Sequence, residues 1–414
     1  MRAGPRDSPP DGFKRMLYMS ELPPSTLAGA PLIVRELLAG YDPKRLDVLC
    51  CARQYGVPDP VVRASYLGCD HTVVANSQRW ELRPGRFFGP LWESINLARV
   101  PRIVSLGRRI VATRGTEAIF SVPWRCDFAV AAYLLSRRTG LPLYVFEMDD
   151  WEAMNSHALP RIIARRYHGR MLRHAKRIWL ISPAMVRRYR ERFGVGGEFL
   201  HHHVDVERYL EESERREPFS DPARLSLVYT GSINRMFADT MRAVCETLNR
   251  GMEVDGRRVT LSIYGASCPP ELLGPQVTFE GLVASEEIPA VLASADVLLI
   301  GVTFSREPEL LELVKTSIYT KTVDYLAANR PVLIVSPRYA AEVEYFGGVA
   351  TVLDSVHPER LAEALRRIGN DRQATKERSR RGLELVRTRH STAAVLDGFL
   401  TSFRSPEVSP PSAR

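Results

Sequence analysis

The sequence predicts an α/β protein built on two doubly wound parallel sheets, one in each half of the chain. Short apolar strands alternate with amphipathic helices along both halves, a pattern typical of parallel sheets with helices on both faces. An acidic and polar stretch, Glu207–Pro222, separates the halves. The length of 414 residues also favours two or more domains, each with an ample core.

Individual elements follow from the spacing of apolar residues, which alternates in strands and recurs once per turn in helices. In the first half we predict strands at 15–20, 46–52, 71–76, 117–122, 143–149 and 177–182, and helices at 29–38, 128–138 and 183–192. In the second half we predict strands at 225–230, 259–265, 277–281, 296–301, 331–336 and 349–354, and helices at 236–249, 287–295, 340–346 and 358–368. The expected organisation is a disordered leader (1–12), a first domain (13–206), a linker (207–222), a second domain (223–390) and a disordered tail (405–414).

Composition narrows the class of protein. Hydrophobic residues make up 45% of the chain and charged residues 25%, the balance of a soluble globular protein. No apolar run approaches the ~20 residues that span a bilayer, and the N-terminus lacks the apolar core of a secretory signal. The six Cys are scattered without a C-x-x-C pair, which favours reduced thiols in a cytoplasm over disulfides or zinc. Neither the dinucleotide-binding nor the P-loop glycine motif occurs.

The net charge of +9 is concentrated in the first half. Residues 1–205 carry 31 Lys and Arg against 19 Asp and Glu, whereas residues 206–414 carry 26 against 29. The densest basic run, 159–177, also has an apolar helical face, which suits an anionic membrane or a phosphate-bearing acceptor. The alternative is a solvated basic face packed on a sheet. Nucleic acid is disfavoured because aromatic residues are not interleaved as a stacking platform.

The most informative stretch is 316–335, TSIYTKTVDYLAANRPVLIV. Thr320 and Lys321 open a short helix that ends before Pro331, and an apolar strand follows. Lys321 and Asp324 are three residues apart, so they share one face of this helix. A helix N-terminus beside a Lys suits phosphate, and a carboxylate one turn later can accept hydrogen bonds from ribose hydroxyls. The alternative is an ordinary surface Lys–Asp pair.

This stretch resembles the nucleotide-sugar helix of GT-B glycosyltransferases, and of glycosyltransferase family 4 (glycosyl transferases group 1) in particular. Many members read S-x-K-x-x-E-Y-x-A-x-G-x-P-V here, and Lys321, Asp324 and Tyr325 are in step with that pattern. The family usually has Glu in place of Asp324, and often a second Glu in place of Thr316. The resemblance implies a GT-B fold, in which two Rossmann-like domains face a cleft and a last helix, 391–404, crosses back to the first domain.

In the second half the resemblance continues through LSLVYTGSINR (225–235), VTLSIYGAS (259–267) and VTFEGLVASEEIPAVLASADVLLI (277–300). It implies that strand ends and a helix start meet the diphosphate, that a segment after the third strand carries the base, and that Asp324 holds the ribose. The implied donor-binding residues are Gly231, Ser232, Arg235, Gly265, Gly281, Val283, Thr320, Lys321 and Asp324.

The first half matches the family more loosely. MLYMSELPPSTLAGAPLIVRELL (16–38) resembles its first strand, glycine loop and helix, which implies that Gly29 lies on the acceptor side. GLPLYVFEMDDWEAM (140–154) resembles a later strand with an Asp-rich loop, and Asp150 is the candidate catalytic group near the acceptor. We expect no metal site, because neither the Asp pair at 149–150 nor the three His at 201–203 has credible ligand spacing.

These features predict a metal-independent glycosyltransferase of the hexosyltransferase type. It would move a sugar from a nucleotide diphosphate sugar to a glycan, lipid-linked or small-molecule acceptor, and the resemblance implies retention of configuration. No cofactor is expected besides this donor. We also expect the protein to act in polysaccharide biosynthesis and to be cytoplasmic, with peripheral contact with an anionic membrane through 159–177. Two alternatives stay open: an inert GT-B-like binding or scaffold protein, which Thr316 favours, and a nucleotide-sugar 2-epimerase of the same architecture.

Overall fold

The computed structural model describes residues 12–26, 29–51, 64–74, 96–155 and 158–404. The expected leader and tail lie outside these residues, apart from Gly12. The chain forms two compact units. Unit 1 comprises Met1–Leu180, Arg188–Phe199 and Leu396–Arg414, and unit 2 comprises Ile181–Arg187 and Leu200–Val395.

Unit 1 is built on a parallel sheet with the strand order β3-β2-β1-β4-β5-β6-β7. Its strands are β1 (Met16–Met19), β2 (Leu46–Cys51), β3 (Asp70–Val74), β4 (Ala118–Ser121), β5 (Leu143–Glu147), β6 (Arg177–Leu180) and β7 (Glu198–Phe199). Its helices are α1 (Ala30–Leu38), α4 (Val100–Arg114), α5 (Cys126–Thr139), α6 (Trp151–Met154) and α7 (Ala158–His174), with a 3-10 turn, η1 (Pro43–Arg45). The helix α8 (Pro183–Phe193) begins in residues of unit 2 and ends in unit 1.

Sequence chemistry explains how these elements begin and end. The central strands are buried along their whole length, as expected for a parallel sheet covered on both faces. Helix α4, which the sequence analysis did not predict, has a proline in its first turn and ends at Gly115, whose φ of 69° is the left-handed conformation that glycine adopts easily. Gly140 ends α5 in the same way, with a φ of 73°.

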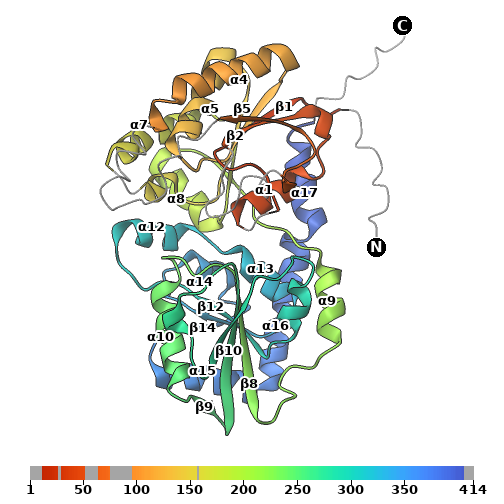
Figure 1. Ribbon diagram of the computed structural model, residues 1–414, viewed down its shortest axis with the longest axis vertical. Coiled ribbons are helices and arrows are strands. Elements are labelled where there is room, and N and C mark those ends of the chain that lie inside the picture. Colours follow the sequence, from red (N-terminus) through yellow and green to blue (C-terminus); the bar gives the residue numbers. More distant parts are fainter. Residues whose placement is uncertain (1–11, 27–28, 52–63, 75–95, 156–157, 405–414) are drawn as a thin grey trace. The chain divides into compact units, whose positions relative to one another are not determined.

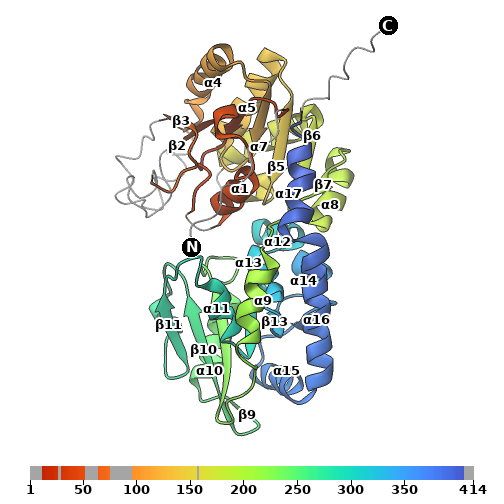
Figure 2. The same ribbon diagram turned by 90° about the vertical axis from the view of Figure 1, so that its right-hand side faces the viewer.

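The end of the last helix, α17 (Thr392–Thr401), completes the core of unit 1. Phe399 and Phe403 are buried against Phe120 and Trp179, with ring centroids 5.1–5.9 Å apart. The Phe403 ring also lies 4.6 Å from that of Tyr144. Figure 2 shows α17 beside β5 and β6. Residues some 260 positions downstream of Tyr144 therefore stabilise this core.

Unit 2 is built on a second parallel sheet with the order β11-β10-β8-β12-β13-β14, and β9 pairs antiparallel with β10. Its strands are β8 (Arg224–Thr230), β9 (Glu253–Val254), β10 (Arg257–Tyr264), β11 (Val277–Gly281), β12 (Val297–Gly301), β13 (Val332–Val335) and β14 (Thr351–Leu353). Its helices are α9 (Val206–Glu214), α10 (Ala238–Asn249), α11 (Ile288–Ala293), α12 (Pro308–Thr316), α13 (Thr320–Ala327), α14 (Ala341–Phe346), α15 (Pro358–Asn370) and α16 (Arg372–Arg389), with a 3-10 turn, η3 (Pro270–Leu272).

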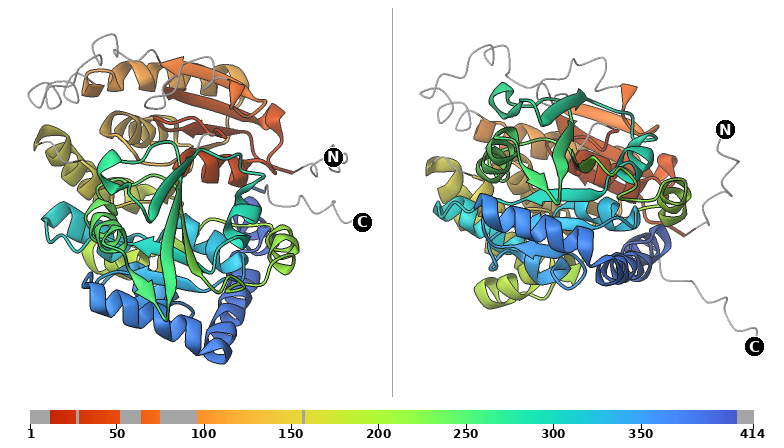
Figure 3. Two further views of the ribbon diagram at one scale, coloured as in Figure 1. Left: turned by 60° about the horizontal axis from the view of Figure 1, so that its bottom comes forward. Right: turned by 90° about the horizontal axis from the view of Figure 1, so that it is seen from below.

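Helices cover both faces of the unit 2 sheet. Figure 1 shows α10 beside β10. Helix α13 packs on β13, and α16 packs on α13. Figure 3 shows α15 and α16, in blue, next to each other at the margin of this sheet. Both sheets are thus doubly wound, which confirms the predicted fold class.

The acidic stretch 207–222 differs from the linker that the sequence predicted. Its first part forms α9, which lies within unit 2 and contacts α11 and α13. Val206 and Tyr209 are buried while the acidic residues point outward, so the helix hides a short apolar face behind a charged one. None of the described helices combines the length and the apolar character that a membrane crossing requires.

Candidate functional site

Three of the glycines predicted to bind the donor lie together at the carboxyl edge of the unit 2 sheet. Gly231, Gly265 and Gly281 end β8, β10 and β11, which are neighbours in the sheet. The Gly231 N–H donates to the Tyr264 carbonyl at 2.7 Å, and the Gly265 N–H donates to the Gly281 carbonyl at 2.9 Å. A Cβ atom on Gly265 would lie 2.8 Å from the Gly231 oxygen. Only glycine therefore permits this close approach of two strand ends.

Lys321 brings a cation to the same edge. A Cβ atom on Gly231 would lie 3.4 Å from Lys321 Nζ, so the ammonium group sits directly beside this glycine. Lys321 Nζ donates to the Tyr229 hydroxyl at 2.6 Å and lies 4.1 Å and 4.3 Å from the ring centroids of Tyr229 and Phe237. Two aromatic rings and one hydroxyl thus hold the cation against the strand end.

The charge of Lys321 is only weakly supported by its surroundings. Burial lowers the pKa of Lys321 to about 7, although the Glu342 carboxylate opposes the shift. Glu342 is itself fully buried, and burial raises its pKa to about 7 despite hydrogen bonds from Thr322 Oγ1 and the Tyr319 N–H. The edge therefore presents a cation that gains its full charge when an anion arrives to stabilise it.

Asp324 is held by two residues that the sequence analysis did not single out for this role. Its Oδ1 accepts a hydrogen bond from the Tyr209 hydroxyl at 2.8 Å and lies 3.3 Å from Nε2 of His202. The Asp324 side chain is 21% exposed. Because both contacts reach the same oxygen, the carboxylate is fixed in orientation while part of it faces solvent.

Thr316 stands where the family often has Glu, and the structure shows a different role for it. It ends α12, is fully buried, and donates from Oγ1 to the Glu312 carbonyl at 2.7 Å. Its own carbonyl accepts a hydrogen bond from Ser182 Oγ. The side chain at this position is part of the packing of unit 2.

The other predicted donor residues lie around this edge. Ser232 and Arg235 are exposed in the loop after β8, and the Ser232 carbonyl accepts from the Tyr229 hydroxyl at 3.0 Å. Val283 is half-buried just after β11. Thr320 is the first residue of α13. The helix predicted at 236–249 is α10, which begins at Ala238 after a loop whose Met236 and Phe237 side chains are buried, so its N-terminus does not adjoin Gly231.

On the unit 1 side, Gly29 and Asp150 occupy different kinds of position. Gly29 precedes α1 with a φ of 83°, and its carbonyl accepts from the N–H groups of Leu32 and Ile33. Asp150 is fully buried and caps α6, accepting from the Ala153 N–H at 2.9 Å. Its other oxygen contacts the Tyr189 hydroxyl at 3.2 Å and Arg192 at 3.4 Å. The prediction that Asp150 presents a polar group to an acceptor is therefore corrected: its carboxylate is committed to structural bonds.

Asp150 belongs to a buried charged cluster centred on His168. His168 Nε2 contacts Glu147 at 2.8 Å, and Nδ1 contacts Glu152 at 3.3 Å. Tyr189 donates to Glu147 at 2.6 Å, and Arg192 pairs with Glu152. Burial acts to lower the pKa of His168, but Glu147 and Glu152 outweigh it and raise the pKa to about 9. This cluster fixes the loop from β5 into α6.

The three consecutive His residues do not converge on one point. His202 approaches Asp324, His203 contacts Thr392 Oγ1 at 3.3 Å, and His201 packs against the ring of His390. Burial lowers the pKa of His390 to about 4, so this ring is neutral around pH 7. Within the described ranges, no three or more His, Cys, Asp or Glu side chains are arranged to hold a metal ion.

Sequence reasoning missed Tyr229, Phe237 and Tyr209 as parts of the donor side. Tyr229 lies two residues before Gly231, the glycine that follows β8, so the two positions lie on the same face of the strand. This spacing could have identified Tyr229. Tyr209 left no such signal, because its partner Asp324 lies 115 residues away.

Comparison with known proteins supports the same architecture. Residues 28–201 match the family model described as a glycosyl transferase 4-like domain. No curated protein sequence matches the chain significantly.

The fold is similar to that of several solved enzymes. Sucrose-phosphate synthase from Thermosynechococcus elongatus aligns at 13% identity with a TM-score of 0.67, covering 94% of this chain and 97% of that one. HepE from Anabaena, in complex with UDP and glucose, aligns at 14% identity with a TM-score of 0.66, covering 94% and 99%. An α,α-trehalose-phosphate synthase (UDP-forming) from Burkholderia vietnamiensis aligns at 14% identity with a TM-score of 0.61, covering 94% and 97%.

At such low identity these likenesses establish the fold, which is GT-B with two Rossmann-like domains. The resemblance to GT-B glycosyltransferases that the sequence indicated is confirmed.

The His168 cluster predicts how the stability of unit 1 depends on pH. A raised folded-state pKa means that the stabilisation is complete below the unfolded value near 6.5 and is lost as pH rises through about 9. The expected loss is on the order of 3 kcal/mol. All five Trp residues lie in the first half of the chain, so denaturant unfolding followed by Trp fluorescence reports on unit 1.

His168→Gln should lower this stability and remove most of its pH dependence between about 6.5 and 9. His357→Gln, at an exposed position of unit 2, is the matched control and should leave the Trp-detected curve unchanged. A wild-type curve that stays flat across this pH range would contradict the assigned charge of His168.

Proposed function

We propose that this protein is a glycosyltransferase that uses a nucleotide diphosphate sugar as its donor. The observation that supports this most strongly is the placement of Lys321 beside Gly231, with Asp324 one turn further along α13. A cation at glycine strand ends suits a diphosphate, and a fixed carboxylate nearby suits vicinal ribose hydroxyls. An inert surface pair would need neither the aromatic contacts of Lys321 nor the two contacts to Asp324.

Each residue then has a definite role in the reaction. Lys321, which lies beside Gly231, stabilises the diphosphate as the bond to the sugar breaks, with Arg235 as a second cation from the exposed loop. Asp324 binds the ribose, and the segment from Gly281 to Val283 carries the base. HepE was solved with UDP-glucose, so UDP-glucose is the first donor to test here.

Several finer features belong to the same proposal. We propose transfer of a hexosyl group with retention of configuration, without a metal ion, to a glycan, lipid-linked or small-molecule acceptor bound on the side of unit 1, in polysaccharide biosynthesis and in the cytoplasm. The buried Asp150 has no place in this scheme, since its carboxylate is bonded within unit 1.

Thr316 supports one competing function, a binding protein with a GT-B fold that lacks turnover. Its buried side chain leaves no carboxylate at the position where the family has Glu. The two proposals differ in one observable, because a binding protein takes up the nucleotide sugar without transferring or slowly hydrolysing the sugar. Release of UDP from UDP-glucose by the purified chain therefore separates them.

The first prediction concerns Asp324. Hydrogen bonds to a charged group contribute roughly 1.5–3 kcal/mol each, so Asp324→Ala should weaken UDP binding ~10- to 100-fold. Asp324→Glu should bind more tightly than Asp324→Ala, because it keeps a carboxylate. Tyr209→Phe should weaken binding by only ~3- to 10-fold, since it removes the positioning bond and leaves the carboxylate in place. Isothermal titration calorimetry on variants of confirmed fold measures all three.

If Lys321 and Asp324 were merely an exposed ion pair, they would contribute ~0–1 kcal/mol to stability and nothing to nucleotide binding. Asp324→Ala binding UDP as tightly as the parent would move the donor site elsewhere. Asp221→Ala, which removes a carboxylate in the loop before β8, is the matched control.

The second prediction concerns the pH dependence of donor binding. Because the pKa of Lys321 is about 7 in the free protein, the ammonium is mostly charged below pH 7 and must take up a proton on binding above it. Affinity for UDP-glucose, whose diphosphate is doubly esterified and does not titrate near neutrality, should fall by up to about tenfold per pH unit above 7.

Lys321→Arg tests the cause, because a guanidinium stays charged and should flatten this dependence. Calorimetry in two buffers of different ionisation enthalpy counts the protons taken up by the parent near pH 8. Zero uptake together with a flat affinity profile would show that Lys321 is already charged in the free protein.

The third prediction concerns metal. Lys321, with Arg235 in the exposed loop after β8, supplies the positive charge that a divalent cation would otherwise bring to the diphosphate. Transfer or slow hydrolysis of the donor should therefore survive EDTA unchanged. Activity lost on chelation and restored by Mn²⁺ or Mg²⁺ would overturn metal independence.

We also propose that unit 1 contacts an anionic membrane, and the structure narrows the surface involved. Met171 and Leu172 of the predicted apolar face are buried in unit 1, whereas Leu159 and Ile162 are 44% and 60% exposed. Met154, at the end of α6, is 37% exposed. No acidic residue occurs from 158 to 177, so the apolar side chains are accompanied only by positive charge.

The fourth prediction tests this surface with vesicles. Co-sedimentation with vesicles containing phosphatidylglycerol should exceed that with pure phosphatidylcholine, and salt should weaken it, because each basic residue near the surface contributes ~1 kcal/mol before screening. Ile162→Asp should reduce the bound fraction, whereas Leu273→Asp, which alters an exposed leucine of unit 2, should not. Equal recovery with neutral and anionic vesicles would contradict the proposed membrane contact.

A further inference from the structure

The parallel sheet of unit 1 changes direction between β1 and β4. From β1 the chain proceeds outward through β2 and β3, and then returns to β4 and proceeds the other way to β7. In open α/β sheets, ligands bind outside the carboxyl ends of the strands at such a point. Here the segments after the two strands are tied together, since Ser20 Oγ donates to the Val122 carbonyl at 2.8 Å and Arg125 pairs with Glu21 at 2.8 Å.

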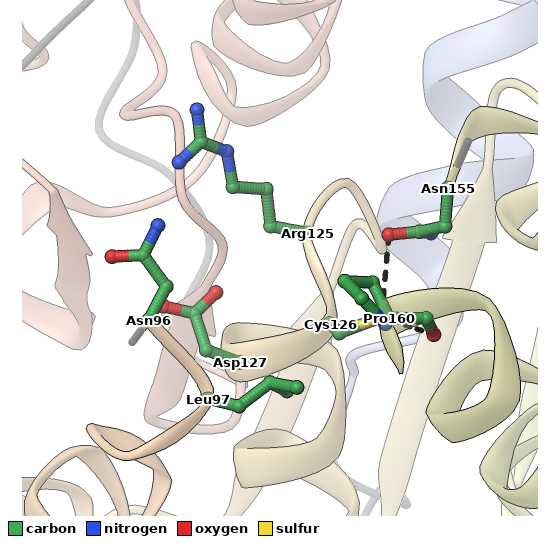
Figure 4. A pocket seen from close by; sticks show the side chains of 7 residues that line it. All are labelled: Asn96, Leu97, Arg125, Cys126, Asp127, Asn155 and Pro160. Carbon is green, nitrogen blue, oxygen red and sulfur yellow. Dashed lines mark hydrogen bonds between the residues drawn. The ribbon is translucent and has the colours of Figure 1, made fainter. Parts of the chain in front are cut away.

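A pocket opens beside this point. It has a volume of about 230 Å³, its open mouth included. The lining residues are Asn96, Leu97, Arg125, Cys126, Asp127, Asn155 and Pro160. Figure 4 shows the Asn96 amide and the Arg125 guanidinium extending into the same region, from the segment before α4 and from the N-terminus of α5. The enclosed space takes only about one water-sized group, roughly 10 Å³, so it suits a single hydroxyl or the hydroxymethyl arm of a sugar and not a whole ring.

Asn96 is the unusual residue of this pocket. It is 2% exposed, and within the described residues neither its amide nitrogen nor its amide oxygen has a hydrogen-bond partner. Buried side-chain amides are nearly always paired, because leaving both ends without a partner forfeits the bonds they made with water. Asn155, on the other side of the pocket, is by contrast paired with Cys126 and with the Trp151 carbonyl. A polar group that enters the pocket would therefore meet one amide that is ready to bond.

The charges around the pocket are already paired with one another. Arg125 is paired with Glu21, and Asp127 accepts from Arg99 and from the Phe128 N–H. Among the described residues, these two cations are each paired with a carboxylate, so the described part of the pocket favours neither an anion nor a cation. The Asn96 amide is neutral, and it offers N–H donors and a carbonyl acceptor together.

We propose that this pocket binds a neutral, hydroxyl-bearing group of a sugar. A hydroxyl both donates and accepts, so a single sugar hydroxyl inserted into the pocket complements the Asn96 amide. The role of that sugar as the acceptor rests on the proposed function, whereas its binding does not. Asn96 is then a binding residue of unit 1, and it takes the place on the acceptor side that the buried Asp150 does not fill.

Saturation-transfer-difference NMR on the full chain tests the proposal with defined probes. The neutral probes are the methyl glycosides of glucose, galactose and mannose, and the anionic probes are glucuronic acid and inorganic phosphate. At least one neutral glycoside should give a signal with the parent protein. Asn96→Ala should weaken its binding at least about fivefold, because both amide bonds are lost. Asn370→Ala, at an exposed position of α15, should leave it unchanged.

Folding of the variant is checked by its melting temperature. Asn96→Ala removes an amide that has no protein partner, so its melting temperature should equal that of the parent. A clear drop, together with glycoside signals that do not change, would mean that the amide holds only a trapped water, and the proposal would fail. It would also fail if the anionic probes bound in place of the neutral ones, or if no neutral glycoside bound up to its solubility limit.

Titration with UDP on the same samples keeps the two proposals apart. UDP binding without any glycoside signal would overturn the pocket and leave the donor site intact. Glycoside binding that depends on Asn96, without UDP binding, would overturn the donor site and leave the pocket intact.

Discussion

The close approach of two strand ends in unit 2 is the constraint on which the proposed donor site depends. Gly265 comes so near to Gly231 that a single added carbon would lie 2.8 Å from a carbonyl oxygen. Side chains are thereby excluded from the middle of the carboxyl edge, and the space beside Gly231 is open to Lys321. The ammonium is held there by Tyr229 and Phe237 instead of by a carboxylate bond. A cation with aromatic partners keeps its donors available to an incoming diphosphate, at the cost of a lowered pKa.

Asp324 shows how the chain accommodates a carboxylate one carbon shorter than the family's Glu. The Tyr209 hydroxyl and the His202 ring contact one oxygen and hold the short side chain in place. Tyr209 belongs to α9, whose buried face packs within unit 2. The helix α13, which bears the proposed donor residues, is thus supported by a segment whose acidic composition predicted a linker. Orientation of the carboxylate is built from side chains that lie far apart in the sequence.

The parts of the fold that could be predicted are those with a local cause. Buried parallel strands are short apolar runs, and Gly231, Gly265 and Gly281 stand at their ends, so the edge of the sheet was visible in the sequence. Helix α9 was missed because most of its surface is charged and only one narrow stripe is buried. Helix α4 has apolar residues at helical spacing, a local signal that was not used. No local pattern records that Tyr209 bonds to Asp324.

Asp150 illustrates a different limit. An acidic residue at the end of a parallel strand is in the right place for a catalytic group, and the sequence shows no more than that. Whether it faces a substrate depends on His168, Tyr189 and Arg192, which come from α7 and α8 and surround it. Burial raises the pKa of Asp150, and the charge of His168 opposes that shift. The cluster thus gives the loop after β5 a fixed shape, which is a structural contribution to whatever binds nearby.

Thr316, at the position where the family often has Glu, is likewise committed to packing. Because the Thr316 side chain is fully buried and bonded to the Glu312 carbonyl, restoring the family residue by Thr316→Glu would place a carboxylate in the packing of unit 2. A buried, unpaired carboxylate is costly, and Ser182 already bonds to the carbonyl at this position. Thr316→Glu is therefore not expected to return the family's contact by itself. The end of α12 is packed around a small residue, and the Thr316 side chain is not exposed to a ligand.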